Sequence, residues 1–318
     1  MPFDPPDAAH DNTLAAAVLR ALGSPDAPLL GSGVESLVFA LGSDDVVKVY
    51  RAQDTPWQER CEAFVARLAA AEPPFALPVT LHTGAVEGAR YAIQRRIPGR
   101  LLAGVLPALR GAERERALLS YLDTAESIGR LDLTSDSLAT PARTHPFSHL
   151  LGRGAEPSDS WPDFLRGWCL AHLRRDEAGV RKDVPALDAA LARYEALLPL
   201  IADVTEPRLV HGDYWPENVL IGDDCRISGI VDWSANVLAG DPRVDLAQAI
   251  VYLDMLDGFV PADVPFLLHE ATRRYGPGIE AIVELYRLHY ALMYAADCKH
   301  FDPLTYRWCL RHLRSVSA

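Results

Sequence analysis

The spacing of apolar positions divides the chain into two parts. Before residue 98, short apolar runs alternate with Gly, Asp and Ser, which is the pattern of strands joined by tight turns. This pattern predicts strands on both sides of Gly31-Ser32-Gly33, within residues 29–41, and a third strand over 46–50. The other elements expected in this part are two strands and two helices, over residues 78–83, 90–97, 14–22 and 56–70.

Beyond Pro98-Gly99 the pattern becomes helical. Apolar residues recur at spacings of three and four from Leu118 to Ile128, which predicts the buried face of a helix. Residues 132–160 are rich in Ser, Thr, Pro and Gly and predict a long loop. Further helices are expected near residues 161–175, 186–201, 244–256, 262–275, 279–296 and 303–315. We therefore expect an α+β protein with a small β-rich domain, residues 1–97, and a larger, mainly helical domain, residues 98–318.

Residues 209–221 place a carboxylate and an amide at a fixed spacing, in the register His211-x-Asp213-x-x-x-x-Asn218. In phosphoryl-transfer enzymes, the Asp of such a loop accepts the proton of the attacking hydroxyl and the Asn holds Mg²⁺. Asp232 ends a second apolar run, after a turn at Gly222-Asp223-Asp224. Either motif alone would indicate only a turn. Both on one predicted hairpin favour a catalytic and metal-binding site with oxygen ligands.

Lys48 interrupts the apolar run of the third predicted strand, between Val47 and Val49. A solvated sheet face would explain an isolated lysine equally well. Glu62, however, lies beside the apolar face of the next predicted helix. A strand lysine paired with a helix glutamate is how kinases direct an ammonium group at nucleotide phosphates. Glu59, one helical turn away, is the competing partner.

Composition limits the classes of partner. The chain has 318 residues and a formal net charge of −12, which argues against a general nucleic-acid binder. The five cysteines are widely spaced without a Cys-x-x-Cys, which predicts reduced, mostly buried thiols and no zinc site. The N-terminal residues lack the basic and apolar parts of a signal peptide, and no apolar run approaches the length of a membrane span. We expect a cytoplasmic protein that does not bind membranes.

The order of these parts resembles the aminoglycoside phosphotransferase family, within the protein-kinase-like fold, over most of the chain. The motifs that carry the resemblance are Gly31-Ser32-Gly33, Lys48 with Glu62, residues 95–99, His211 through Asn218, Asp232 and Gly240-Asp241-Pro242-Arg243-Val244-Asp245. The catalytic-loop and Gly-Asp-Pro motifs are specific in combination, whereas the glycine turn is not. The resemblance implies a two-lobed fold and a small-molecule kinase that uses ATP and Mg²⁺.

The resemblance also implies a role for each matching residue. Asp213 would deprotonate the acceptor hydroxyl, and Asn218 with Asp232 would hold magnesium. Lys48, fixed by Glu62, would contact the phosphates next to Ser32 and Gly33, and the backbone of Arg95 and Ile97 would pair with the base. His211, Asp241 and Asp245 would be structural, with His211 bracing the loop and Asp245 tying the following helix to it.

The sequence departs from protein kinases after Asp232. Trp233 stands where protein kinases carry Phe-Gly, and only seven residues separate Asp232 from the Gly240 motif. This spacing leaves no room for a long activation segment, so a small-molecule acceptor is favoured over a protein. A non-catalytic, nucleotide-binding pseudokinase is the alternative from another functional class.

The acceptor itself stays open among the classes that the resemblance implies: aminoglycosides, macrolides, choline, homoserine, methylthioribose and other sugars. An ammonium-bearing acceptor would suit acids and aromatic faces in the C-terminal third. Acids on amphipathic helices are, however, usually only solvated surface. Trp215 is a candidate wall of the acceptor site. The other candidates are Asp254, Asp257, Glu270, Asp297, Asp302, Tyr290 and Tyr294. The sequence gives no prediction of the oligomeric state.

Overall fold

The computed structural model describes residues 8–33, 35–51, 54–131, 145–151, 155–300 and 302–316. The chain forms two compact units, which are described separately below. The first, here called the sheet unit, comprises Met1–Glu72 and Ala76–Pro98. The second, the helical unit, comprises Pro73–Phe75 and Gly99–Ala318. The sheet unit therefore ends at Pro98, next to the boundary predicted from the sequence.

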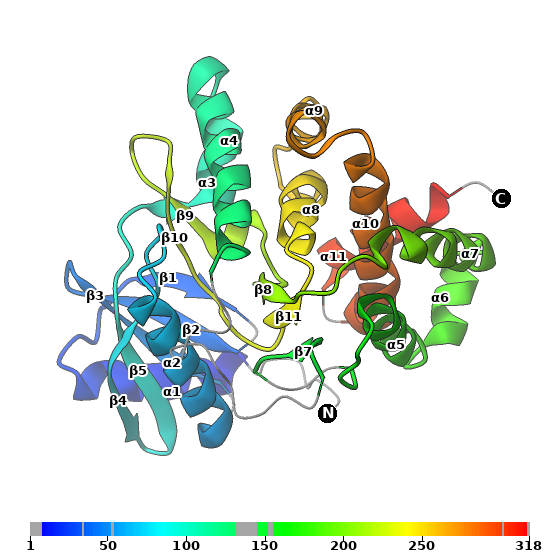
Figure 1. Ribbon diagram of the computed structural model, residues 1–318. Helices are drawn as coiled ribbons and strands as arrows, with labels where there is room; N and C mark the ends of the chain where they lie inside the picture. Colours follow the sequence, from blue (N-terminus) through cyan, green and yellow to red (C-terminus); the bar gives the residue numbers. More distant parts are fainter. Residues whose placement is uncertain are drawn as a thin grey trace. The chain divides into compact units, whose positions relative to one another are not determined.

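The sheet unit is built on one antiparallel sheet with the strand order β1-β2-β3-β5-β4 (Figure 1). Its strands are β1 (Leu29–Ser32), β2 (Ser36–Leu41), β3 (Asp45–Tyr50), β4 (Thr80–Val86) and β5 (Ala89–Arg95). Two helices accompany the sheet, α1 (Ala8–Ala21) and α2 (Thr55–Ala70). The helix α1 begins earlier than the apolar pattern predicted.

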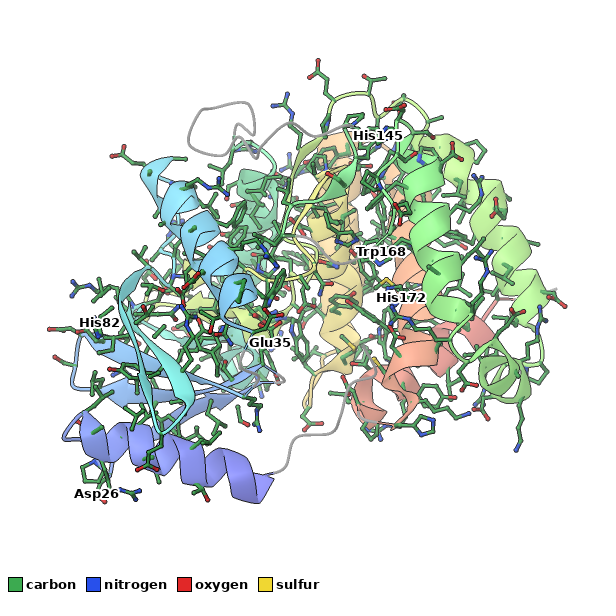
Figure 2. The ribbon with its side chains drawn as sticks, turned by 90° about the horizontal axis from the view of Figure 1, so that it is seen from below. Asp26, Glu35, His82, His145, Trp168 and His172 are labelled. Atoms are coloured by element: carbon green, nitrogen blue, oxygen red, sulfur yellow. The ribbon has the colours of Figure 1, made fainter. Side chains whose placement is uncertain are left out.

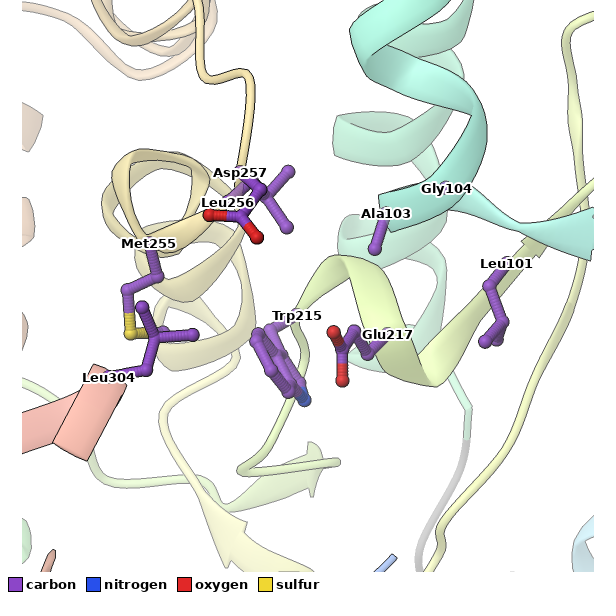
Figure 3. A pocket seen from close by; sticks show the side chains of 9 residues that line it. All are labelled: Leu101, Ala103, Gly104, Trp215, Glu217, Met255, Leu256, Asp257 and Leu304. Atoms are coloured by element: carbon purple, nitrogen blue, oxygen red, sulfur yellow. The ribbon is translucent and has the colours of Figure 1, made fainter. Parts of the chain in front are cut away.

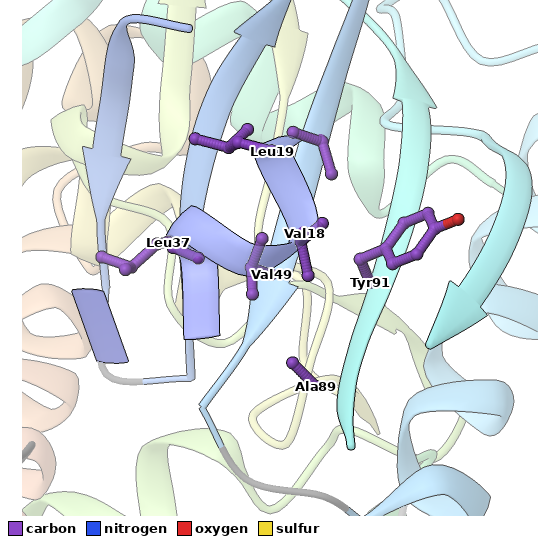
Figure 4. Close-up of a cluster of buried hydrophobic side chains, with 8 residues drawn as sticks. Val18, Leu19, Leu37, Val49, Ala89 and Tyr91 are labelled. Atoms are coloured by element: carbon purple, nitrogen blue, oxygen red, sulfur yellow. The ribbon is translucent and has the colours of Figure 1, made fainter. Parts of the chain in front are cut away.

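The two faces of β3 have different surroundings, because successive side chains of a strand point to opposite faces of the sheet. Val47 and Val49 belong to a buried cluster with Val18 and Leu19 of α1 (Figure 4). Lys48 and Tyr50 therefore share the opposite face of the strand. The core on the α1 side fixes the register of β3, and this register determines where the Lys48 side chain emerges.

The helical unit is organised around α10 (Ile279–Asp297), which packs against α5, α7, α8, α9 and α11. Its residues are apolar on most sides, as expected of a helix surrounded by others. The surrounding helices are α5 (Trp161–Leu173), α7 (Leu187–Leu197), α8 (Arg243–Val251), α9 (Asp263–Tyr275) and α11 (Pro303–Arg314). A further long helix, α4 (Gly111–Ile128), packs against α8.

Two small antiparallel sheets complete the helical unit. One has the order β10-β9-β6 and contains β6 (Arg100–Leu101), β9 (Val219–Ile221) and β10 (Ile227–Ile230). The other has the order β7-β11-β8 and contains β7 (Ser148–His149), β8 (Arg208–Val210) and β11 (Leu238–Gly240). The remaining short helices are α3 (Leu102–Val105), α6 (Glu177–Asp183) and 3₁₀ turns over Leu106–Ala108, Leu198–Ile201, Pro216–Asn218, Tyr252–Met255 and Cys298–His300.

The structure confirms the predicted fold class, with a β-sheet unit followed by a mainly helical one. The predicted loop over 132–160 is only partly described, since residues 132–144 and 152–154 lie outside the described ranges. Its described part includes β7 and a bridge between Phe147 and Ser158. All five cysteines are free thiols, and only Cys61 is not fully buried. Within the described part of the chain, no helix has both the length and the apolar character to cross a membrane.

Candidate active site

The loop that follows β8 contains the His-x-Asp register, and its backbone turns sharply at Gly212. Gly212 has a φ of +76°, which an L side chain rarely adopts. A Cβ at this position would lie 2.0 Å from the carbonyl oxygen of Asn236. A glycine is therefore required here for two reasons, and its turn presents the following residue, Asp213.

Two side chains of α8 hold this turn through its backbone. The carboxylate of Asp245 accepts hydrogen bonds from the amides of His211, at 2.8 Å, and Gly212, at 2.9 Å. One turn further along the helix, Gln248 accepts from the amide of Tyr214 and donates to the carbonyl of Gly212, both at 2.8 Å. Both side chains are fully buried, so they form a rigid cradle for the loop.

Burial sets the protonation of the groups under the loop. It lowers the pKa of His211 to about 4, so the ring is neutral at physiological pH. The ring Nδ1 accepts from the amide of Asp213 at 3.3 Å, and Nε2 donates to the carbonyl of Val231 at 3.0 Å. Burial raises the pKa of Asp245 to about 7, although its two backbone hydrogen bonds act in the opposite direction. The structural roles predicted for His211 and Asp245 agree with these contacts.

Asp213 and Asn218 are joined directly. The side-chain amide of Asn218 donates to the backbone carbonyl of Asp213 at 2.9 Å and to its carboxylate at 3.1 Å. Both contacts use the nitrogen of the amide. The amide oxygen has no hydrogen-bond partner among the described residues, so it is available as a hard ligand.

Asp232 is brought to the same end of the β9–β10 hairpin. Ile230 pairs with Val219, and the amide of Val231 donates to the carbonyl of Asn218 at 2.9 Å. Asp232 itself has a φ of +63°, an uncommon value for a non-glycine residue. Its carboxylate makes no ion pair or hydrogen bond within the described ranges. The Asp232 carboxylate and the Asn218 amide oxygen thus lie at the same end of two paired strands, without partners among the described residues. Together they fit the oxygen donors that Mg²⁺ prefers.

The sheet unit shows a different ion pair from the predicted one. Glu62 does not pair with Lys48. Its carboxylate is held by Arg90, with contacts of 3.0 and 3.1 Å, and it accepts a hydrogen bond from the hydroxyl of Tyr50 at 2.8 Å. Glu59, the competing partner, is exposed. The predicted pairing overlooked Arg90, which shares the same face of the sheet and delivers two N–H donors to one carboxylate.

Lys48 is instead associated with an aromatic ring. Its ammonium lies 5.3 Å from the centroid of the Tyr50 ring, and the Arg90 guanidinium lies 5.4 Å from it. Among the described residues, the ammonium makes no ion pair. Burial and the neighbouring Glu62 raise the pKa of Tyr50, so its hydroxyl remains a donor to that carboxylate. Lys48 is thus a half-buried cation whose charge has no acidic partner within the described ranges.

The other predicted nucleotide contacts also lie in the sheet unit. Arg51 at the end of β3 donates to the hydroxyl of Ser32 at 2.9 Å and to the carbonyl of Gly33 at 3.0 Å, which ties the glycine turn to the strand. The amide of Arg95 is already bonded to the carbonyl of Val79 at 3.0 Å. The amide of Ile97 has no hydrogen-bond partner in the described ranges.

The family of the chain follows from a comparison of its sequence with models of known protein families. The model of the phosphotransferase enzyme family matches residues 26–285, which include the glycine turn, Lys48, the catalytic loop and Asp232. The chain belongs to this family. The prediction that it is a phosphotransferase is thereby confirmed, and nothing in the comparisons supports the pseudokinase alternative. No curated protein matches the sequence of this phosphotransferase.

Solved structures give the fold of the phosphotransferase independently. The GDP complex of aminoglycoside 2'-phosphotransferase-IIIa has a TM-score of 0.61 and 16% identity, covering 96% of this chain and 97% of that one. The streptomycin–ATP complex of APH(2")-IIa has a TM-score of 0.59 and 17% identity, with 97% and 96% covered. A macrolide 2'-phosphotransferase from Brachybacterium faecium has a TM-score of 0.53 and 17% identity, with 97% and 99% covered.

Some acids proposed for the acceptor side have other partners in the phosphotransferase. Asp254 pairs with Arg311 and His312, Glu270 with Arg273 and Arg274, and Asp297 with His172 and Arg175. Asp302 caps α11 through the amides of Leu304 and Thr305. By contrast, Trp215 and Asp257 line a common pocket with Glu217 (Figure 3). Tyr290 is buried in the core.

Several residues that support the site do not stand out in the sequence. Gln248 lies three positions after Asp245, so the helical spacing was the available signal. Tyr121 on α4 donates its hydroxyl to the carbonyl of Tyr214, and the Tyr214 hydroxyl donates to the carbonyl of Tyr121, at 3.1 and 2.9 Å. In the sequence, Tyr121 is one position of the apolar stripe that runs from Leu118 to Ile128. Nothing in the sequence distinguished this tyrosine from an ordinary core residue.

Proposed function

We propose that this phosphotransferase moves the γ-phosphate of ATP to a hydroxyl of a small molecule, with Asp213 as the catalytic base. The observation that supports it most is the geometry of one hairpin. Asp213 is hydrogen-bonded to Asn218, and Asp232 follows the residue paired with Asn218 on the next strand. Phosphoryl transfer depends mainly on positioning and charge neutralisation, and a held carboxylate beside two hard oxygen donors supplies both.

Each group has a distinct task in this proposal. Asp213 orients the acceptor hydroxyl and accepts its proton at a carboxylate oxygen as the oxygen attacks phosphorus. Asn218 and Asp232 would hold Mg²⁺, which neutralises charge on the nucleotide phosphates when bound. In the sheet unit, Lys48 together with the turn at Ser32 and Gly33 binds the phosphates. The base pairs with the backbone of Arg95 and Ile97, chiefly through the amide of Ile97, which has no partner among the described residues. Glu62 helps to position Lys48 indirectly, because it accepts a hydrogen bond from Tyr50, whose ring lies next to the Lys48 ammonium.

The short spacing after Asp232 favours a small acceptor over a protein. Trp233 is buried and donates from its ring nitrogen to the carbonyl of Ile230 at 3.2 Å. The chain then enters β11 at Leu238 and α8 at Arg243. No extended segment for docking a peptide lies between Asp232 and α8, and this stretch is fully described.

The test is ADP release from Mg-ATP across a panel of aminoglycosides, macrolides, amino alcohols and sugars. We expect release with one acceptor class and a loss of about 10²–10⁴-fold in Asp213→Asn. Nucleotide affinity, measured by calorimetry, should be unchanged in that variant because Asp213 does not bind the nucleotide. Full activity of Asp213→Asn would refute its assignment as the base. Phosphorylation of a protein mixture without small-molecule activity would refute the acceptor class.

A further inference from the structure

A pocket of about 320 Å³ opens in the helical unit beside the catalytic loop (Figure 3). Trp215 and Glu217, which lie two and four positions after Asp213, form one wall. Other walls are formed by Leu101 at the end of β6, by Met255 with Asp257, and by Leu304 at the start of α11. The pocket is therefore built by four segments that are distant in sequence and is connected to the proposed base through one short loop.

The walls of this pocket are largely apolar. Leu101 and Leu304 are each 37% exposed. Covering such aliphatic side chains with a ligand removes them from water, which would stabilise the complex. Figure 3 shows the Trp215 ring between the side chains of Met255 and Leu304 on one side and Glu217 on the other. A ligand in this pocket must therefore present apolar surface.

Two negative charges interrupt the apolar lining. Glu217 and Asp257 make no ion pair with any described residue, in contrast to Asp254, Glu270 and Asp297, which are all neutralised by neighbouring cations. The pocket thus carries uncompensated negative potential, which a cation would relieve.

We propose that this pocket binds the acceptor, and that the acceptor is an alcohol with an apolar body and one ammonium group. The inference rests on the proposed function and specifies its substrate class. The ammonium group lies between Glu217 and Asp257, where the face of Trp215 adds a cation–π contact. The apolar body covers Leu101 and Leu304. In the transfer, the acceptor oxygen forms a bond to the γ-phosphorus while the bond from that phosphorus to ADP breaks. ADP leaves, and Asp213 takes the hydroxyl proton.

The same surface disfavours the other acceptor types. A polycationic sugar would place charged groups over leucine side chains, where they lose water without gaining a partner. A neutral apolar alcohol would leave both carboxylates desolvated and unpaired. The ammonium alcohol satisfies both parts of the lining, so it should have the lowest KM of the three types.

The experiment compares three acceptors with the full-length protein: a tertiary amino alcohol with an aromatic or aliphatic body, its neutral isostere with carbon in place of nitrogen, and a polycationic amino sugar. We expect Glu217→Gln and Asp257→Asn each to raise the KM of the amino alcohol about fivefold, with kcat nearly unchanged, as for a partly exposed ion pair. The KM for the neutral isostere should be high, and neither substitution should raise it further, because the penalty of leaving a carboxylate unpaired is removed with the charge. Glu115→Gln, which removes an exposed acid of α4 outside the pocket, is the matched charge control and should change neither value.

Binding of the amino alcohol is measured separately by calorimetry without nucleotide. Binding that weakens in Glu217→Gln while no acceptor is phosphorylated would support the pocket and refute the proposed function. Phosphorylation of the polycationic sugar with a KM that neither substitution changes would support the function and overturn this inference. Absence of amine binding to the wild-type protein would also overturn it.

Discussion

The catalytic loop and the surroundings of Lys48 carry the two halves of the proposed machinery, and the structure holds them in different ways. In the helical unit, Asp245 and Gln248 satisfy three backbone amides and one carbonyl of the loop from one buried helix face. In the sheet unit, the ammonium of Lys48 lies over the ring of Tyr50, and the acid expected beside it is paired with Arg90. The loop is fixed by hydrogen bonds, whereas the contacts that hold Lys48 among the described residues are those of its strand and a ring.

This difference is consistent with the chemistry of each half. A catalytic base must be held in one geometry, and buried hydrogen bonds with every partner satisfied enforce one arrangement. A phosphate-binding lysine must instead leave its charge available for the ligand, so a strong ion pair in the free protein would compete with the nucleotide. The Arg90–Glu62 pair keeps a carboxylate of the same face occupied, so Glu62 does not compete with the nucleotide for Lys48.

The largest expected effect comes from breaking the cradle. Asp245→Ala would leave the buried amides of His211 and Gly212 without acceptors and should lower the free energy of unfolding by about 4 kcal/mol. Urea unfolding followed by tryptophan fluorescence measures this, because five of the six tryptophans lie in the helical unit and only Trp57 in the sheet unit. Asp245→Asn keeps one acceptor oxygen and is the matched control, with roughly half the loss. Equal stability of Asp245→Ala and the wild type would contradict the cradle.

The grouping of the proposed catalytic residues could be predicted from the sequence more completely than the contacts around Lys48. That Asp213, Asn218 and Asp232 lie together could be predicted because their spacing and the intervening turn are local properties of one hairpin. Arg90 was not found because its contact with Glu62 joins residues 28 positions apart, on a strand and a helix. Short elements such as α6 and β11 were missed because three to seven residues contain too little periodicity. The contribution of Leu101 and Leu304 to one pocket likewise exists only in the folded chain.

Acidification is expected to destabilise the helical unit more than the sheet unit. The reason is that the helical unit contains buried histidines with lowered pKa values. Burial lowers the pKa of His149 to about 4 and that of His289 to about 3, and both rings contact Trp168. Trp168 in turn donates to His172, and Figure 2 shows these two labelled side chains next to each other. In the sheet unit, His82 is exposed.

The direction in which stability changes with pH depends on whether the folded or the unfolded chain binds more protons. Between pH 6.5 and 4 the unfolded chain protonates His149 and His289 while the folded chain does not, so the stability present above pH 6.5 is lost as pH falls. Two protons correspond to about 2.7 kcal/mol per pH unit at most. His211 acts in the same direction, and Asp245, whose pKa is raised, acts in the opposite direction. We expect a net loss of about 3 kcal/mol between pH 7 and 5.

Hydrogen exchange at both pH values would locate this acid effect. Protection should decrease in α5 and α10 and remain nearly unchanged in β2, β3 and β5. His149→Asn should reduce the pH dependence by about one proton. Equal loss of protection in both units would mean that the buried histidines are not the cause.

The third effect is in the sheet unit. Arg90→Gln leaves the carboxylate of Glu62, whose side chain is only 12% exposed, with Tyr50 as its remaining described partner, and should cost about 2 kcal/mol. Glu62→Gln removes the anion instead, and the double substitution should recover part of the loss because neither charge is then unpaired. A double-mutant cycle in urea measures this coupling. A coupling energy near zero would show that the pair does not stabilise the unit.

The smallest effect separates the role of the Tyr50 hydroxyl from that of its ring, and it tests how Lys48 is held. Tyr50→Phe removes the hydrogen bond to Glu62 but keeps the ring under the ammonium of Lys48, so stability should fall by about 1 kcal/mol while the KM for ATP stays unchanged. Tyr50→Leu removes the ring as well and should raise the KM for ATP about threefold, the worth of a partly exposed cation–π contact. Steady-state kinetics with saturating acceptor measures both variants. If Phe and Leu raised the KM equally, the hydroxyl would position Lys48 through Glu62, and the contrast between a loop held by hydrogen bonds and a lysine held by a ring would fail.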